Sequence, residues 1–368
     1  MQPGEYRQTG RKYSPGLQEL AQFLDLGSLI PAPGLVIPPV GRGLAWYEAG
    51  RATLARVDYI PDLLTLSRDL SAAGAPGWPY ERAAERGRML RVHHGVYAPA
   101  DRWAKLTETQ RYTHRVLGAV LESRTSPIVS HISAAALHGA PIIGPMPSLV
   151  HVLCTIAAGT RTEHGIRKHA TADLHHGIER RGQLTVSGIT RTVVEVASDC
   201  TFSTAVGVTD WALAQGHVDK DMLRTTLDDL GIRRGRSKAL RVFEFADGRS
   251  GSPGESLSRV RMHEFGFPAP VLQQRFEDGD GLAGIVDFWW PEHQLIGEFD
   301  GVAKYVREDL TRGKDVTQIV LDEKWREDRL RACGPRVTRW DWATAWPQYG
   351  LYAHLLKAGL PSSRRTAG

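Results

Sequence analysis

Two short apolar stretches, separated by four residues, constrain the fold of this chain more than any other feature of its sequence. Residues 284–290 are Gly-Ile-Val-Asp-Phe-Trp-Trp, residues 295–301 are Leu-Ile-Gly-Glu-Phe-Asp-Gly, and Pro-Glu-His-Gln lies between them. Aromatic and β-branched residues on both sides of so short a connection predict a β-hairpin. We expect its turn to close symmetrically about Glu292 and His293.

The symmetric turn determines which residues face one another. Asp287 then lies directly opposite Glu298, and Trp289 lies opposite Ile296. Asp300 follows Glu298 by two residues, so the alternation of side chains along a strand places it on the same face. Facing Cβ atoms are only about 4.5–5.5 Å apart, and like charges at that separation destabilise a sheet. We therefore expect a cation between Asp287, Glu298 and Asp300.

Mg²⁺, or Mn²⁺, is the cation that suits these three carboxylates best. It takes carboxylate and water oxygens and leaves coordination positions for phosphate, whereas the lack of nearby Cys and of paired His argues against zinc. Such a metal supports phosphodiester hydrolysis, because it lowers the pKa of a bound water and neutralises developing charge. The alternative is a solvated strand face, which is common in antiparallel sheets. Ile285, Trp289 and Ile296, expected on the same face, make it too apolar for a plain solvated surface.

The composition excludes several other classes of protein. With 368 residues, 42% of them hydrophobic and 24% charged, the chain can bury a sizeable core and is expected to form two or three domains. It contains no run of 18 uncharged apolar residues, which excludes a membrane span, and its start lacks the order of a signal peptide. We therefore expect a cytoplasmic, nucleoid-associated protein. Three widely spaced cysteines, expected to be reduced, predict neither a disulfide framework nor a zinc site.

The composition changes abruptly near the beginning of the first predicted domain. Residues 1–56 are rich in Pro and Gly and predict a poorly ordered extension, so the natural start could lie near Val57. In residues 57–100 we expect a helix from about Leu63, a second short helix over residues 80–86 and a two-stranded hairpin over residues 89–97.

This order of elements resembles a winged helix-turn-helix, in which the second helix enters the major groove of DNA and the hairpin touches the backbone. The candidate DNA contacts are Arg82, Arg86, Arg88 and Arg91. Arg82 and Arg86 are four residues apart and so share one helix face. The net charge of +5 is compatible with a polyanionic partner. The alternative is an exposed arginine face on a small packing module.

The middle of the chain, residues 101–245, predicts an α+β domain. We expect helices over residues 130–138, 191–198, 204–214 and 220–230, and a buried strand over residues 148–154. His164, His169, His175 and His176 lie close in sequence, but their spacings of five, six and one match no common metal-ligand motif. We therefore predict solvated or hydrogen-bonded histidines.

After a linker of small and turn-forming residues at 248–253, several ordered motifs resemble those of the restriction-endonuclease-like domains related to very-short-patch-repair endonucleases. They are Gly254-Glu255-Ser256 before a predicted helix, Val286-Asp287-Phe288, Gly297-Glu298-Phe299-Asp300-Gly301 with Lys304 and Tyr305, the segment 323–331, and Gly334 with Val337, Arg339 and Trp340. The resemblance implies a PD-(D/E)xK fold, which is a mixed sheet flanked by helices, over residues 250–350. A tail follows over residues 351–368.

The same resemblance implies roles for individual residues. Asp287 and Glu298 correspond to metal ligands, and Glu255 is a further acid from the first helix. The usual signature places Lys two residues after the second acid, where this chain has Asp300. Lys304 is the nearest substitute, and a surface position for its side chain is equally compatible with the sequence. The departure leaves catalytic competence open.

Residues 61–240 resemble the AbiEi-like abortive-infection antitoxin family. The resemblance lies in the predicted winged helix, in Ser133-Ala-Ala-Ala-Leu-His138-Gly, in Val150-His151-Val152 and in Arg191-Thr-Val-Val194. That family pairs a DNA-binding wing with a second domain that represses its own operon or counters a nucleotidyltransferase toxin. The resemblance therefore implies DNA and a toxin as partners.

The sequence thus supports two hypotheses about function. The first is a DNA-binding protein with a C-terminal Mg²⁺-dependent endonuclease, used in defence or repair. The second is a non-catalytic regulator or antitoxin in which the nuclease fold is inactive. In a helix predicted over residues 319–331, Lys324 and Arg331 are candidate contacts to the DNA backbone, although most charges of that helix suit an exposed, salt-bridged face.

Overall fold

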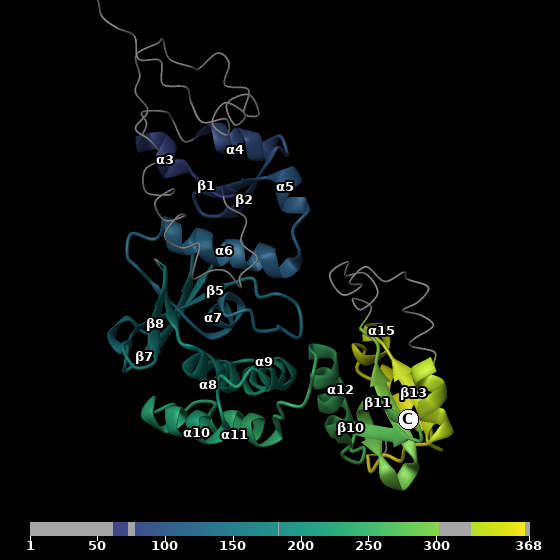
Figure 1. Ribbon diagram of the computed structural model, residues 1–368. Coiled ribbons are helices and arrows are strands. Elements are labelled where there is room, and N and C mark those ends of the chain that lie inside the picture. Colours follow the sequence, from purple (N-terminus) through teal and green to yellow (C-terminus); the bar gives the residue numbers. More distant parts are fainter. Residues whose placement is uncertain (1–61, 73–77, 183, 302–324, 365–368) are drawn as a thin grey trace, which may run out of the picture. The chain divides into compact units, whose positions relative to one another are not determined.

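The computed structural model describes residues 62–72, 78–182, 184–301 and 325–364 (Figure 1). The chain divides into two compact units, the first comprising residues 1–127 with Arg181–Leu184, and the second Ile128–Arg180 with Thr185–Gly368. Helices and strands alternate in both, as expected for a mixed α/β protein. The predicted extension over residues 1–56 lies outside the described residues, as do Lys304 and Lys324.

The first unit contains a small antiparallel sheet with strand order β1-β3-β2. Its elements are β1 (Thr65–Leu66), α3 (Ser67–Ala72), α4 (Trp78–Glu85), β2 (Met89–His93), β3 (Val96–Pro99), α5 (Ala100–Ala104) and α6 (Glu108–Glu122). Buried Tyr80 and Ala83 of α4 pack on Met89 and Tyr97 of the hairpin. The predicted second helix and the hairpin are therefore both present.

The predicted start of the first helix is wrong. Thr65 and Leu66 pair with Tyr97 and Val96 as a strand, and the helix begins only at Ser67. The backbone N–H of Ser67 donates to the Gly95 carbonyl at 2.9 Å, which holds this segment on the hairpin. Leucines at helical spacing did not reveal this, because a long-range strand pairing overrides local periodicity.

The second unit contains a six-stranded mixed sheet with strand order β6-β7-β5-β4-β9-β8. Its strands are β4 (Ile128–Val129), β5 (Val150–Thr155), β6 (Arg161–Glu163), β7 (Ile166–Thr171), β8 (Ile178–Arg181) and β9 (Leu184–Ser187). β5 runs parallel to β7, and β4 runs parallel to β9. Helix α7 (His131–Leu137) follows β4 and contacts β5, in agreement with the helix and the strand predicted there.

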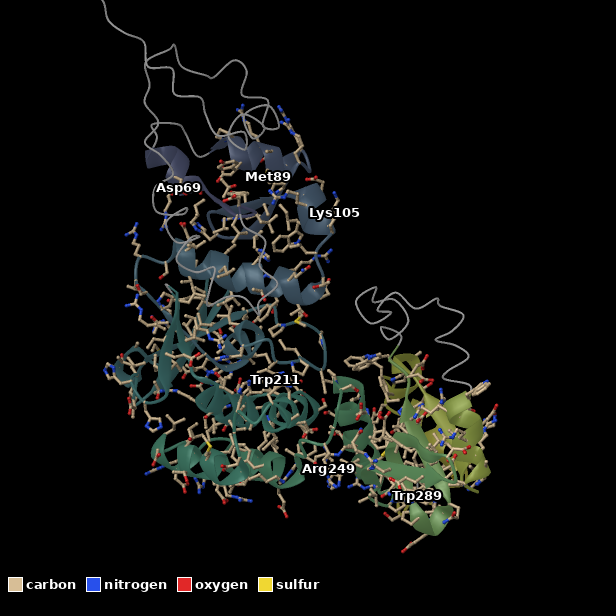
Figure 2. The ribbon with its side chains drawn as sticks, viewed as in Figure 1. Asp69, Met89, Lys105, Trp211, Arg249 and Trp289 are labelled. Carbon is tan, nitrogen blue, oxygen red and sulfur yellow. The ribbon has the colours of Figure 1, made fainter. Side chains whose placement is uncertain are left out.

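A helical layer follows the sheet, as Figure 1 shows for α8 to α11. The helices are α8 (Ile189–Asp199), α9 (Phe202–Ala214), α10 (Lys220–Asp229), α11 (Arg236–Phe245) and α12 (Pro253–Glu264). A buried ion pair joins α12 to α9, since Arg259 Nη1 lies 2.9 Å from Asp210 Oδ2 with side chains 9% and 1% exposed. The segment 248–253, predicted as a linker, therefore lies within one compact unit. Figure 2 marks Arg249 there, where its guanidinium pairs with Asp247 at 2.7 Å.

The last part of the second unit is a four-stranded mixed sheet with strand order β10-β11-β12-β13. Its elements are β10 (Val271–Asp278), β11 (Gly281–Trp290), a 3₁₀ turn η2 (Pro291–His293), β12 (Leu295–Phe299), β13 (Arg336–Trp340), α15 (Trp342–Ala345) and α16 (Gly350–Lys357). The first two strand junctions are antiparallel and the last is parallel. A further helix covers residues 325–332.

The predicted register of the hairpin is confirmed for residues 288–290, which pair with residues 295–297, whereas the predicted pairing of Asp287 with Glu298 is not among the pairs of this ladder. Trp289, labelled in Figure 2, pairs with Ile296, and Phe288 pairs with Gly297. One face of the sheet packs Phe288 with residues from α12, α15 and α16, and the other packs Ile296 against Leu330 of the 325–332 helix.

Among the described residues, no helix is both long and apolar enough to cross a membrane.

Candidate functional site

Four acids predicted as a site, Glu255, Asp287, Glu298 and Asp300, are called the carboxylate group below. Glu255 lies in the first turn of α12, where Ser252 caps the helix by accepting a hydrogen bond from the Glu255 N–H at 3.2 Å. The side-chain amide of Gln273 lies 3.1 Å from Glu255 Oε2 and 3.5 Å from Asp287 Oδ1. One amide thus lies between an acid of the helix and an acid of β11.

The sheet is irregular where Gln273 and Asp287 face each other. The pairing of β10 with β11 includes Leu272 with Phe288 and Gln274 with Val286, but not the residues between them. Gln273 has a φ of 51°, in the left-handed region that non-glycine residues rarely adopt. Asp287 Oδ2 accepts a hydrogen bond from the Phe299 N–H at 2.9 Å, so its carboxylate takes the place of a strand carbonyl. Such local strain is concentrated at functional sites.

Glu298 is held by two arginines. Its Oε1 accepts from Arg326 Nη2 at 2.7 Å, and its Oε2 lies 2.8 Å from Arg339 Nη2. Arg326 comes from the 325–332 helix, whereas Arg339 is the neighbour of Glu298 on β13. Burial raises the pKa of Glu298, the two arginines lower it, and the nearby Asp287 charge raises it again. These ion pairs could not be predicted from residue spacing, since the partners are 28 and 41 residues away.

Asp300 lies at the edge of this network. Its Oδ1 is 3.9 Å from Arg339 Nη1, and its side chain is 39% exposed. The expected ring of three acids around one ion is not observed. Within the described part of the chain, three candidate ligand atoms lie within 4.8 Å of one another only in a different group, which is His151, His169 and Asp199. The predicted apolar surroundings are also only partly correct, since Ile285 is 42% exposed. Val286, and not Ile285, packs in one cluster with Trp289 and Ile296. The irregular position of β11, Asp287, lies between Val286 and Trp289 and interrupts the alternation of side chains.

The predicted DNA contacts that the structure describes lie on α4, between α4 and β2, on β2 and on the 325–332 helix. Arg82 and Arg86 are exposed, and the helical hydrogen bond from Arg86 N to Arg82 O at 3.1 Å keeps them on one face. Arg91, on β2, is exposed as well, while Arg88 is half-buried. Arg331, on the 325–332 helix, forms an ion pair with Glu327 one turn earlier.

A second group of side chains, called the histidine cluster below, consists of His131, His151, His169 and Asp199. His169 Nε2 lies 3.0 Å from His151 Nδ1, and the rings of His131 and His169 stack with centroids 3.6 Å apart. Asp199 ends α8, and together with His151 and His169 it forms the described group whose ligand atoms lie within 4.8 Å of one another. The hydrogen bond agrees with the prediction of a hydrogen-bonded His169, and its partner, His151, lies 18 residues earlier in the sequence.

The histidine cluster is linked to a buried ion pair on α8. Arg191 Nε donates to Glu195 Oε1 at 2.7 Å, with side chains 2% and 3% exposed. Glu195 Oε2 in turn accepts from the backbone N–H of His131 at 2.9 Å. Burial lowers the pKa of His151 to about 4 and also lowers the pKa values of His131 and His169. The three imidazoles are therefore neutral at neutral pH.

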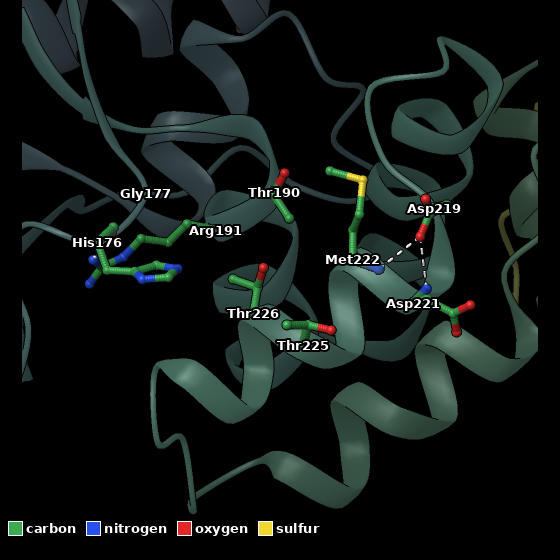
Figure 3. A pocket seen from close by; sticks show the side chains of 9 residues that line it. All are labelled: His176, Gly177, Thr190, Arg191, Asp219, Asp221, Met222, Thr225 and Thr226. Carbon is green, nitrogen blue, oxygen red and sulfur yellow. Dashed lines mark hydrogen bonds between the residues drawn. The ribbon is translucent and has the colours of Figure 1, made fainter.

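A hollow of about 550 Å³ lies elsewhere in the second unit, lined by residues that include Arg191, Thr190 and Met222 (Figure 3). The Arg191 guanidinium is committed to Glu195 and to the His176 carbonyl, which it reaches at 2.6 Å. Asp219 caps α10 through the N–H groups of Asp221 and Met222, as the dashed lines in Figure 3 mark. These polar groups serve the fold, so the hollow offers little for recognition of a ligand.

Comparison with known proteins gives relatives but no activity. No family model matches the chain. Two uncharacterized proteins of Mycobacterium tuberculosis, MT2308 of strain CDC 1551 / Oshkosh and Rv2248 of strain ATCC 25618 / H37Rv, are each 29% identical to it over 265 residues, which is 66% of this chain and 89% of the relative. A structure titled "Crystal structure of RV2827C protein from Mycobacterium tuberculosis" aligns with 14% identity over 68% of this chain and 93% of that chain. Its TM-score of 0.33 is too low to support an argument.

Proposed function

We propose that this chain is a DNA-binding protein whose C-terminal sheet carries a Mg²⁺-dependent endonuclease site. The observation that carries the proposal is the approach of acids from three elements, with Gln273 between Glu255 and Asp287, and with Asp287 close enough to Glu298 to raise its pKa. Repulsion of this kind inside a sheet calls for compensating positive charge, and we propose that a metal ion contributes to it together with the two arginines on Glu298.

The donor chemistry suits Mg²⁺. The ion binds through one or two carboxylates and keeps several waters, so Asp287 and Glu298 suffice without a ring of three acids. When bound, it supplies a water of lowered pKa and an electrophile for a phosphodiester. In the structure, Arg326 and Arg339 balance the charge of Glu298, with side chains 29% and 21% exposed. If Mg²⁺ were held by Asp287 and Glu298, Arg326 or Arg339 would be released from Glu298 and could bind a phosphate group of the substrate.

The first unit supplies the DNA-binding surface in this proposal. Its helix, helix and hairpin match the order of a winged helix-turn-helix, and exposed arginines lie on α4 (Arg82), in the turn after it (Arg86) and on β2 (Arg91). Each arginine that contacts a phosphate releases about one counterion on binding. Loss of Arg82 should therefore weaken binding to all DNA sequences and lower the salt dependence by about one unit of slope.

Plasmid cleavage tests the nuclease proposal. We expect the purified full chain to nick or cut plasmid DNA with Mg²⁺ or Mn²⁺, and Asp287→Asn and Glu298→Gln to lower the rate about 100-fold or more while DNA binding persists. Glu292→Gln is the matched control, because Glu292 is an exposed acid in the turn of the same hairpin. Equal cutting by all variants would show that the activity comes from elsewhere.

A second function is favoured by the two ion pairs on Glu298. If Arg326 and Arg339 hold the carboxylate permanently, the sheet binds DNA or a partner protein without cleaving, as in a transcriptional regulator or antitoxin. Asp300 in the usual place of lysine supports the same alternative. Operator-specific DNA binding by a wild-type chain that does not cut with either metal would favour this function over the first.

A further inference from the structure

We propose that His151, His169 and Asp199 form a binding site for a divalent transition metal of the zinc class. This site is separate from the carboxylate group and does not depend on the proposed nuclease activity. The three residues come from β5, β7 and the end of α8, and one potential ligand atom of each lies within 4.8 Å of the others.

The sheet brings the two histidines together. β5 and β7 are adjacent parallel strands, in which His151 pairs with Arg167 and Leu153 pairs with His169. His151 and His169 are therefore two positions apart in register and share one face of the sheet. The hydrogen bond from the His151 N–H to Ser133 Oγ at 2.8 Å fixes the start of β5 against α7. Rigid strands thus hold both imidazoles in place.

The separation of the two nitrogens fits a shared metal ion. His169 Nε2 and His151 Nδ1 are 3.0 Å apart. Two imidazole nitrogens bound to zinc at about 2.0–2.1 Å lie about 3.3 Å apart at a tetrahedral angle. Replacing the shared proton with a metal therefore requires the rings to separate by only a few tenths of an ångström.

The surroundings orient one ring and leave the site accessible. His131 stacks on His169 with an interplanar angle of 18°, which restricts rotation of the His169 ring. His151 and His169 are 8% and 9% exposed, whereas Asp199 is exposed. Solvent therefore reaches the site from the side of the carboxylate. Three protein ligands with a fourth position open to water form the arrangement found in zinc sites that keep an exchangeable ligand.

The choice of metal follows from the ligands. Two imidazoles and one carboxylate suit zinc and the neighbouring transition metals, whereas Mg²⁺ and Ca²⁺ prefer oxygen ligands alone. One charged group opposes metal binding, because Arg167 Nη2 lies 3.7 Å from Asp199 Oδ1. The arginine side chain is 39% exposed and can turn into solvent, which frees the carboxylate for the ion.

Metal titration of the chelator-treated full chain tests the site. With Co²⁺ as the spectroscopic probe, we expect the visible absorption of a four- or five-coordinate ion, and competition with Zn²⁺ should give one Zn²⁺ per chain. His151→Ala and Asp199→Asn should each weaken Zn²⁺ binding about tenfold or more. His175→Ala is the matched control, because His175 is an exposed histidine of the same unit outside the cluster. Arg167→Gln should tighten binding, since it removes the competing cation.

Two further measurements separate loss of the site from loss of folding and from effects of the carboxylate group. Asp199→Asn changes an exposed residue without changing its shape, so circular dichroism should show it folded even if His151→Ala is not. Asp287→Asn should leave the Zn²⁺ affinity unchanged, which separates this site from the carboxylate group. Absence of Zn²⁺ binding by the wild type at micromolar concentrations, or unchanged affinity in Asp199→Asn, would overturn the proposal and leave a hydrogen-bonded pair of histidines.

Discussion

The histidine cluster and the carboxylate group each pack several titratable side chains together, but they differ in how the charge of these side chains is accommodated. In the histidine cluster, burial lowers the pKa values, so the three imidazoles carry no charge at neutral pH. In the carboxylate group, Glu298 is buried beside another acid, and two arginines balance its charge. Histidine can lose its charge near neutral pH and carboxylates cannot, so the acids require cations where the histidines do not.

The largest expected effect concerns the buried ion pair beside the histidine cluster. Glu195→Ala leaves the 2% exposed Arg191 without its carboxylate partner, and we expect the free energy of unfolding to fall by about 3–5 kcal/mol. Urea denaturation monitored by circular dichroism measures this change. Arg224→Ala is the control, because its pair with Asp221 is exposed and should contribute less than about 1 kcal/mol. An equal loss of stability in both variants would contradict the burial of the Arg191–Glu195 pair.

A smaller loss is expected in the carboxylate group. Glu298→Gln removes the charge that Arg326 and Arg339 share, but both arginines reach solvent and keep other partners, such as the Ile285 carbonyl for Arg326. We expect a destabilisation of about 1–3 kcal/mol in the same denaturation experiment. A loss of stability larger than that of Glu195→Ala would contradict the expected order, in which the buried Arg191–Glu195 pair contributes more to stability than the ion pairs of Glu298.

The smallest expected effect is a difference in pH dependence between the two groups. His151 faces the Asp199 carboxylate and the Arg167 guanidinium, and its pKa falls from 6.5 to about 4 on folding. Between these values the unfolded chain binds the proton and the folded chain does not, so this contribution to stability is complete above pH 6.5 and is lost on acidification. For His151 the loss amounts to about 1 kcal/mol between pH 6.5 and 5.5.

Glu298 should contribute with the opposite sign. Its pKa is raised on folding, so just above its ordinary value of 4.5 the folded chain binds the proton more readily, and acidification favours the folded state. Urea denaturation of the metal-free protein at several pH values measures both effects. His151→Asn should flatten the loss of stability below pH 6.5, and Glu298→Gln should make it steeper. If the free energy of unfolding changed with pH in the same way in both variants and the wild type, the expected difference in sign between His151 and Glu298 would be wrong.

Short-range signals in the sequence are sufficient to predict the local elements and the hairpin. The turn-forming residues at 248–253, and the aromatic and β-branched residues on both sides of a four-residue connection, were sufficient to place α12, β11 and β12, because these signals act between neighbouring residues. Symmetry of the turn also gave the correct pairing of Trp289 with Ile296.

The contacts between side chains of distant segments depend on the packing of the whole chain. Arg326 and Arg339 reach Glu298 from two separate elements, and His151 and His169 meet across parallel strands whose order is set by the whole sheet. Grouping histidines by distance along the chain missed this pair. Side-chain spacing predicts contacts within one helix or hairpin, whereas contacts between distant segments depend on how the complete core packs, and that information is not present in any short stretch of sequence.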